Sequence, residues 1–519
     1  MADSRTNNVI KNSTASLLQK LVEMLSQFAL RTAFIYILGK EYTGLSGLFT
    51  DILHVLSLME LGLDSSMIFS LYEPLVKRDT RRIAALLKYY RSAFTVIGFV
   101  VLGAGAACIP FLSYIVKGVP NIKEDIRVIF LMYVITTSFS YFFIYKSVLI
   151  RADQKSRTIS KWTSIFSVGE CVLEILLLLI LKQFYAYLII HLIATVGRNA
   201  LISRISSQMY AEYFKVNDAI LLKEDKRKLF RDFACLVVYN MAGVVINSTD
   251  SVFISAFVGT VEVAIIGNFT LILAAARTVI NQIVGATKPS IGNLAATSSD
   301  DKQELIFRRM NFISFWASCI GCTCLFTLLN PFVGDIWFDS SYKITYDIIA
   351  VLVANFFISV MVLPVESFRT ANGLFVQGWL RPAIMAAINV FLDFWWGKMW
   401  GIFGIFIATT ISRLATQVWY DPWLVYKKAF KQRVNPFFLS YIVFAVITTV
   451  SCAIAHFLCD LFSFRPIVLD FVLKAIVSFA IPNLIIIVTY RKTDEYKYVF
   501  SFVEKLVPHI LRNSKKIKN

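Results

Sequence analysis

Charged residues are scarce in this sequence. Only 17% of its 519 residues are Asp, Glu, Lys or Arg, whereas 57% are hydrophobic. A soluble protein of this length needs a far larger polar surface, so a soluble globular fold is excluded. The short alternating strands of an outer-membrane barrel are also lacking, because the apolar runs are about 20 residues long, enough for a helix to cross roughly 30 Å of hydrocarbon. These features predict an all-α polytopic membrane protein.

Metal-ligand motifs are lacking as well. Cys319, Cys322 and Cys324 are closely spaced, but no histidine or carboxylate accompanies them in their apolar segment. Structural zinc sites need four such ligands, so we interpret these cysteines as small packing residues and expect no metal site or cofactor. His54 and His191 are interpreted as polar groups that pack between helices.

Acidic residues are outnumbered by basic residues, 34 to 52, which gives a net charge of +18. The excess lies in short links between apolar runs, so membrane topology explains it and nucleic acid is not an expected partner. We count about fourteen spans. Alternate links are basic, namely residues 77–82, 151–161, 215–231, 308–309, 427–433 and the tail from 491. Because basic links stay in the cytoplasm, both termini are expected there.

A motif near the start of the chain recurs in its second half. Gly39 with Gly47-x-Phe49-Thr50-x-x-Leu53 returns as Gly259 with Gly267-x-Phe269-Thr270-x-x-Leu273, and 259 − 39 and 273 − 53 both equal 220. Six spans per repeat make the two halves parallel, related by an axis along the membrane normal. The predicted domains are a six-helix lobe (1–213), a basic linker (214–231), a second six-helix lobe (232–426) and a terminal helix pair with a basic tail (427–519).

Four arginines lie well inside predicted spans, namely Arg31, Arg198, Arg277 and Arg413. Charges at hydrocarbon depth are costly and mark a solvated, protein-lined pathway. The guanidinium stays charged, and its planar fork of donors suits phosphate. We predict that the four arginines form a cationic chamber for an anionic substrate. The alternative is that some pair with nearby acids or extend to the membrane interface.

Acidic residues also occur inside the spans. Glu60 and Asp64 are four apart on the second span, Glu170 and Glu174 are four apart on the fifth, and Asp250 lies in the seventh. Each is a candidate either for coupling transport to H+ or Na+ or for acting as a counter-ion of an arginine. The amides that are candidates for lining the same cavity are Asn247, Asn281 and Gln282.

One stretch carries a family resemblance. The run R-T-x-F-I-Y-I-L-G-x-E-Y-x-G-L-x-G-L-F-T-x-I-L, from Arg31 to Leu53, resembles bacterial polysaccharide-biosynthesis flippases. Glu60-Leu-Gly-Leu63, Ser70-Leu-Tyr-x-Pro74-Leu and the basic link at 77–82 are similar to them as well. These are Wzx-type members of the multidrug/oligosaccharidyl-lipid/polysaccharide flippase superfamily.

The resemblance implies a function in the bacterial cytoplasmic membrane. A flippase of this type moves a polyprenyl-pyrophosphate-linked oligosaccharide from the inner to the outer leaflet, by alternating access of two lobes, for cell-surface polysaccharide export. The expected partners are this lipid-linked glycan, membrane lipids and polysaccharide-assembly proteins such as a polymerase. The resemblance also implies a cationic cavity with arginines from the first and eighth spans, which are the places of Arg31 and Arg277.

Two other classes of protein compete with this interpretation. A cation- or proton-coupled drug or small-solute antiporter of the same superfamily stays open as the alternative, because acids inside the spans suit organic cations whereas the arginines do not. A membrane enzyme of the same pathway normally needs a sizeable outer loop or paired carboxylates such as D-x-D. The predicted outer loops are short and carry none, so no enzymatic activity is expected.

Overall fold

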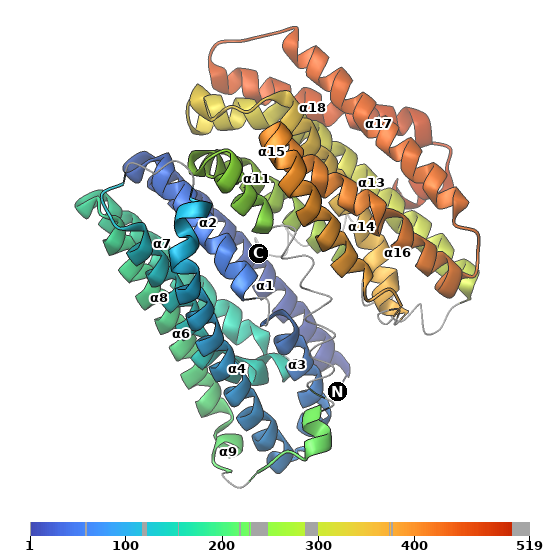
Figure 1. Ribbon diagram of the computed structural model, residues 1–519. Helices are drawn as coiled ribbons and strands as arrows, with labels where there is room; N and C mark the ends of the chain where they lie inside the picture. The colour runs from blue at the N-terminus through green and yellow to red at the C-terminus, as the bar shows by residue number, and fades with distance from the viewer. Residues whose placement is uncertain are drawn as a thin grey trace, which may run out of the picture. The chain divides into compact units, whose positions relative to one another are not determined.

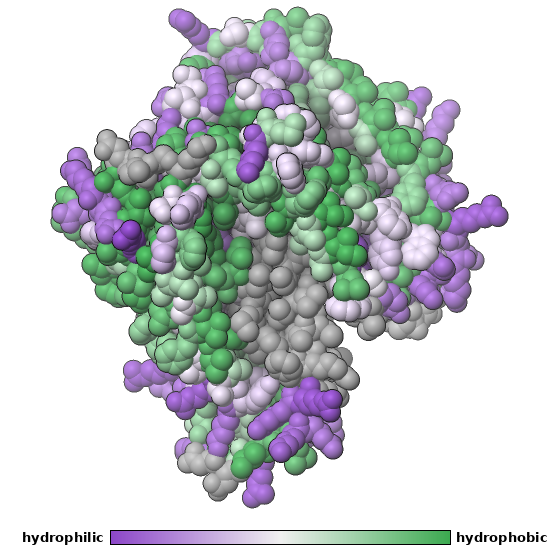
Figure 2. Space-filling model, viewed as in Figure 1, coloured by the Kyte–Doolittle hydropathy of each residue, from purple (hydrophilic) through white to green (hydrophobic). Residues whose placement is uncertain are grey.

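The computed structural model describes residues 2–57, 60–116, 122–153, 155–216, 219–227, 229, 248–285, 299–372, 374 and 377–500. Within these ranges all regular structure is helical and no strand occurs (Figure 1). Among the described residues, eleven segments are long and apolar enough to cross a membrane. The all-α polytopic fold class is therefore confirmed. Hydrophobic residues cover much of the surface along the helices, and hydrophilic residues gather near the helix ends (Figure 2).

One of the eleven segments contains two spans. Arg381–Phe430 combines α15 (Arg381–Ala415), α16 (Gln417–Val425) and the π-helical turn η4 (Tyr426–Phe430) in 50 residues. At 1.5 Å per residue that is about 75 Å, more than twice the hydrocarbon thickness. The backbone breaks at Gly401, whose φ of 58° suits a residue without a side chain. The second and seventh predicted spans reach outside the described ranges, so the total of fourteen stays a prediction.

The chain divides into two compact units. Unit 1 comprises residues 1–267 and 382–401. Among the described residues its helices include α1 (Ala2–Leu38), α2 (Lys40–Leu56), α3 (Glu60–Lys77), α4 (Thr80–Cys108), α5 (Leu112–Ile115), α6 (Ile126–Ala152), α7 (Ser156–Leu181), α8 (Phe184–Met209), α9 (Ala211–Phe214), the start of α11 (Thr260–Gly285) and residues 382–401 of α15. Helix α6 packs against α4 and α8, while α1 packs along α7. Buried aromatic rings join α4 to α6, as where Phe94 stacks on Tyr141.

Unit 2 comprises residues 268–381 and 402–519. It contains the rest of α11 and of α15, α13 (Asp300–Pro331), α14 (Tyr346–Ala371), α16, α17 (Asn435–Asp460) and α18 (Ile467–Tyr490). Helix α13 is central, because α14, α17 and α18 all pack against it. Its buried Phe315 stacks on Phe444 of α17 with ring centroids 4.0 Å apart. These units are defined by contacts, and the lobe boundaries expected from the sequence stay a prediction.

The second span departs from its expected form. Its hydropathy predicts a single helix over Thr43–Leu71, but α2 ends at Leu56 with a turn at Ser57 and α3 begins at Glu60. Both pieces are apolar enough to belong to one span, so hydropathy alone does not reveal a break between them.

The repeated motif begins a helix in both halves. Gly39 immediately precedes α2, and Gly259 immediately precedes α11. The two helices approach closely within unit 1, since a Cβ built on Gly44 would lie 1.9 Å from the Thr260 carbonyl oxygen. A backbone approach of this kind requires glycine.

A buried ion network ties the end of α14 to α16 in unit 2. Asp421 lies 2.8 Å from Arg369 Nη1 and 3.3 Å from Arg381 Nη2. Arg369 also donates to the carbonyl oxygens of Leu374 and Gln377, so the connection after α14 is held from both sides. Each side chain is at most 9% exposed, which makes this a desolvated network.

Candidate functional site

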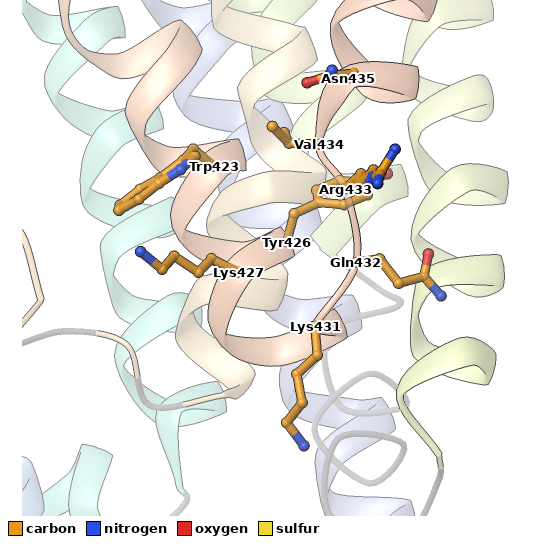
Figure 3. Close-up of a pocket in the computed structure, with 8 residues that line it drawn as sticks. All are labelled: Trp423, Tyr426, Lys427, Lys431, Gln432, Arg433, Val434 and Asn435. Carbon is orange, nitrogen blue, oxygen red and sulfur yellow. The ribbon is translucent and has the colours of Figure 1, made fainter.

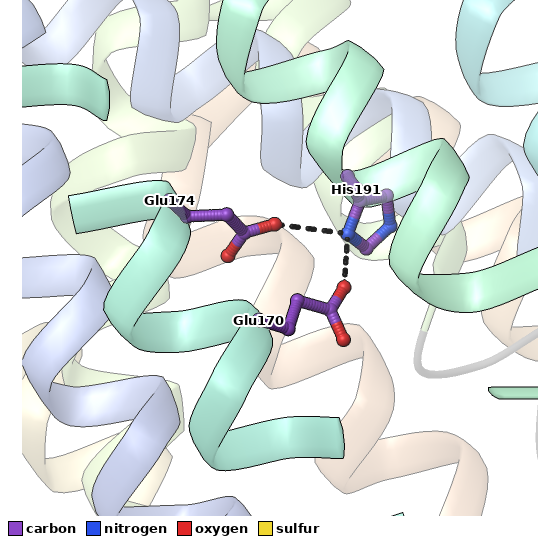
Figure 4. Close-up of side chains that lie close together, drawn as sticks. All are labelled: Glu170, Glu174 and His191. Carbon is purple, nitrogen blue, oxygen red and sulfur yellow. Dashed lines mark ion pairs between the residues drawn. The ribbon is translucent and has the colours of Figure 1, made fainter. Parts of the chain in front are cut away.

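Two of the predicted acids lie beside a histidine in unit 1. Glu170 and Glu174 project from α7 toward His191 of α8 (Figure 4). His191 Nδ1 is 2.9 Å from Glu170 Oε1 and 3.3 Å from Glu174 Oε1. Arg198, one of the predicted substrate arginines, follows on α8 with its Nη1 3.9 Å from Glu170 Oε2. We call these four residues the acid–histidine cluster.

The side chains of this cluster differ in their exposed fraction. The Glu174 side chain is 1% exposed and that of Glu170 is 11% exposed, whereas His191 and Arg198 are 34% and 25% exposed. Glu174 Oε1 has the ion pair with His191 but no hydrogen bond among the described residues. A buried carboxylate oxygen that lacks a hydrogen bond is costly, so Glu174 depends on the ion pair with His191 for its stabilisation.

The cluster's ligand atoms also suit a metal ion. One atom each from Glu170, Glu174 and His191 lie within 4.8 Å of one another. The Arg198 guanidinium beside Glu170 adds a permanent positive charge, which repels a divalent ion but tolerates a proton on a carboxylate. The arrangement therefore suits proton exchange better than metal binding.

Aromatic residues extend the polar network into the neighbouring helices. The Tyr187 ring stacks on His191 with centroids 6.0 Å apart, and the Tyr133 ring of α6 lies 6.4 Å from it. The Tyr133 hydroxyl is 2.6 Å from Ser46 Oγ of α2. Polar side chains thus run from α2 through α6 to α8 and α7.

Arg31 contacts the second copy of the repeat. Its Nη2 donates to the Ala264 carbonyl oxygen of α11 at 2.8 Å. The guanidinium also covers Gly267, where an added Cβ would lie 2.5 Å from Nη2. Arg31 of the first span therefore packs against the α11 backbone of the eighth span. Gly267 of the repeated motif leaves the room that the guanidinium occupies.

The other two predicted arginines lie in unit 2. Arg277 of α11 is half-buried, and its Nε is buried without a hydrogen-bond partner among the described residues. Arg413 Nη1 donates to the Asn355 carbonyl oxygen of α14 at 3.3 Å. Asn281 and Gln282 follow Arg277 on α11 and are exposed.

Two further acids are buried inside unit 1. They are Asp250 and Asp393. Asn389, one turn before Asp393 on α15, donates to it at 3.3 Å. Asp393 Oδ2 has no hydrogen-bond partner among the described residues. The sequence indicates Asp250 as a coupling candidate but does not single out Asn389 and Asp393, although their spacing of four is visible in it.

Three of the predicted site residues cannot be placed relative to the acid–histidine cluster or to the buried acids Asp250 and Asp393. The side chains of Glu60 and Asp64, and the whole of Asn247, lie outside the described residues. The site residues that the structure brings together are therefore Arg198 with Glu170 and Glu174.

Solved structures of membrane transporters have this fold. The lipid II flippase MurJ, in an inward closed conformation, matches with a TM-score of 0.64 and 15% identity, over 93% of this chain and 99% of that one. An inward-facing multidrug resistance MATE transporter of the MOP superfamily matches with a TM-score of 0.55 and 13% identity, over 77% and 94%. A mutant of the Vibrio cholerae MATE transporter VcmN matches with a TM-score of 0.55 and 14% identity, over 83% and 98%.

Sequence comparison adds nothing further, because no family model matches and no curated protein matches. At identities of 13 to 15% the structural likeness shows the fold alone. The chain is a multi-pass helical membrane protein with the fold that the MurJ flippase and the MATE transporters of the MOP superfamily share.

Proposed function

We propose that this protein is a flippase that moves a polyprenyl-pyrophosphate-linked oligosaccharide across the cytoplasmic membrane, from the inner to the outer leaflet, by alternating access of its two lobes. The observation that carries the proposal is Arg277. It is a permanent cation inside a span, and its buried Nε lacks a hydrogen-bond partner among the described residues. A buried donor of this kind favours an anionic ligand.

The other arginines support an anionic substrate. Arg31 and Arg413 lie inside spans, and each donates to a backbone carbonyl oxygen from a guanidinium whose planar fork of donors suits phosphate. Arg198 is 3.9 Å from Glu170, too far for a hydrogen bond and weak enough to exchange for a phosphate. In the proposal these arginines replace the water around the pyrophosphate while the polyprenyl chain stays in lipid, since an unassisted charge in hydrocarbon costs far more.

The likeness to MurJ supports the substrate class. MurJ is described as a lipid II flippase, and its structure is matched over 93% of this chain, against 77 to 83% for the MATE transporters above. We infer that the cytoplasmic membrane is bacterial, that both termini are cytoplasmic and that polysaccharide-assembly proteins such as a polymerase are partners. No enzymatic step is part of the proposal.

Coupling is proposed to run through the acid–histidine cluster. A proton on Glu170 or Glu174 weakens the attraction between Glu170 and Arg198 and leaves the guanidinium for the pyrophosphate. Loss of the proton draws Arg198 back to Glu170. Proton uptake and substrate binding at Arg198 thereby become linked equilibria.

Binding of undecaprenyl pyrophosphate to the purified protein tests the substrate proposal. Native mass spectrometry should show the complex for the natural sequence and a loss of roughly 10- to 100-fold for Arg277→Ala, because a hydrogen bond to a charged group contributes about 1.5–3 kcal/mol. The control is Arg308→Ala, since this 51% exposed side chain pairs with Glu304 on its own helix. Equal binding by both variants would refute the role of Arg277.

The second candidate function is a cation- or proton-coupled antiporter for drugs or small solutes. The observation that favours it is Asp393, a buried carboxylate whose Oδ2 has no hydrogen-bond partner among the described residues, because such a group attracts a cation. Efflux of an organic cation from proteoliposomes distinguishes the two functions. Efflux that Asp393→Asn abolishes, together with no binding of undecaprenyl pyrophosphate, would establish the antiporter.

A further inference from the structure

A basic pocket of about 490 Å³ lies at one end of unit 2 (Figure 3). It forms where η4 is joined to α17 by residues 431–434. The flanking segments, Arg381–Phe430 and Asn435–Asp460, are both candidate membrane spans, so this short link must lie at a membrane surface. The pocket is lined by Trp423, Tyr426, Lys427, Lys431, Gln432, Arg433, Val434 and Asn435.

Only part of the positive charge around this pocket is neutralised. Lys431 Nζ is 3.0 Å from Asp300, and Gln432 donates to Asp301 at 2.7 Å. The first two residues of α13 therefore place their carboxylates against the link. Lys427 and Arg433 form no ion pair with a carboxylate of the described residues. Lys427 instead lies over the Trp423 ring, with Nζ 4.6 Å from its centroid. These two cations therefore give the cavity a net positive charge.

The pocket adjoins exposed apolar surface on both of its helices. Trp419 lies one turn before Trp423 on α16 and is 50% exposed. On α17, Leu439 and Ile442 follow the pocket within two turns and are 68% and 60% exposed. Tryptophan is enriched at the level of lipid headgroups, and exposed aliphatic side chains on a span face lipid tails. The charged cavity thus lies at headgroup level, with surface for hydrocarbon chains next to it.

We propose that this pocket binds the phosphate headgroup of an anionic membrane phospholipid. Its volume is within the range of small-molecule sites. The charges of Lys427 and Arg433 match a phosphate, and Trp423 offers an apolar wall. The link belongs to the basic set expected on the cytoplasmic side, where the leaflet is anionic. The proposal is independent of the transported substrate, because the lipid acts as a fixed ligand that joins α16 to the terminal helix pair.

Lipid binding to the purified full-length protein tests this assignment. Native mass spectrometry compares phosphatidylglycerol with phosphatidylcholine of the same acyl chains. One basic side chain near an anionic surface contributes about fivefold in affinity, so Lys427→Gln with Arg433→Gln should weaken phosphatidylglycerol binding roughly 25-fold. The matched control is Lys428→Gln, because this neighbouring lysine is exposed but does not line the pocket. It should bind as the natural sequence does.

Two further measurements refine this test. One distinguishes the effect of charge from that of side-chain shape, and the other distinguishes a phospholipid from other phosphate ligands. The charge-conserving pair Lys427→Arg with Arg433→Lys should bind within a few-fold of the natural sequence. Inorganic phosphate and undecaprenyl pyrophosphate serve as competitors. The proposal is overturned if the double glutamine variant binds phosphatidylglycerol normally, if Lys428→Gln is equally impaired, or if phosphatidylcholine binds equally well. It is also overturned if the double variant loses only undecaprenyl pyrophosphate or phosphate, because the occupant is then not a phospholipid.

Discussion

Replacing Asp421 by alanine should strongly destabilise unit 2. This residue is the acid partner of two arginines, Arg369 at 2.8 Å and Arg381 at 3.3 Å, and their side chains are 3% and 9% exposed. Removing one partner of a buried ion pair costs about 3–5 kcal/mol, because the remaining charge stays desolvated. Here one substitution affects two guanidiniums, while Arg369 keeps its bonds to two backbone carbonyls. We expect a loss of about 4 kcal/mol in the free energy of unfolding.

A second ion pair in the same unit supplies the matched control. Lys343 and Asp335 are also 2.8 Å apart, but their side chains are 39% and 36% exposed. Asp335→Ala should therefore cost less than about 1 kcal/mol. Denaturant titration of the detergent-solubilised protein, followed by helical circular dichroism, measures both. A similar cost for the two variants would refute the argument from burial, since the distances are the same.

Two other predictions follow from the same structure. Gly44→Ala should destabilise the protein, because its Cβ would lie 1.9 Å from the Thr260 carbonyl oxygen. At Gly103 an added Cβ meets nothing within 4 Å, so Gly103→Ala should raise the free energy of unfolding by up to about 1 kcal/mol. Melting temperatures measure both variants, and unchanged values for both would contradict this prediction. Glu174→Gln should abolish the pH dependence of transport in proteoliposomes. Glu73→Gln, which removes an exposed pair with Lys77, should preserve it, and equal profiles would exclude the cluster from coupling.

The spans are predictable from the sequence because each is a local apolar run. Gly39 before α2 has a φ of 97°, a conformation that favours glycine, so the residue type agrees with the helix boundary there. The break after α2 is not predictable, because the segments on both sides of Ser57 are apolar. Hydropathy therefore does not change where the helix ends. The Gly44 contact also escapes prediction, since it joins helices that are far apart in the chain.

The candidate site is predictable where its residues share one helix. The spacing of four places Glu170 and Glu174 on one face, and in the structure both lie beside His191. The sequence alone indicates only a packing role for His191. His191 lies on α8 and contacts the two glutamates of α7. Nothing in the sequence around His191 indicates which α7 residues it contacts. Asp393 escapes prediction as well, because nothing in its local sequence indicates that its side chain is buried.

The two halves of the repeat place acids on corresponding helices but balance their charge differently. In the first half, the fifth span carries Glu170 and Glu174, and α8 supplies His191 and Arg198 against them. In the second half, the eleventh span carries Asp393, which is buried and accepts a hydrogen bond from Asn389.

The arginines of the two halves also differ. Arg198 on α8 lies 3.9 Å from the Glu170 carboxylate, whereas Arg413 in the second half donates to the Asn355 carbonyl oxygen. The glutamates of the first half thus have two basic groups beside them, His191 and Arg198. In the second half the neutral amide of Asn389 lies beside Asp393. The two halves therefore repeat one sequence pattern but surround their buried acids with different polar groups.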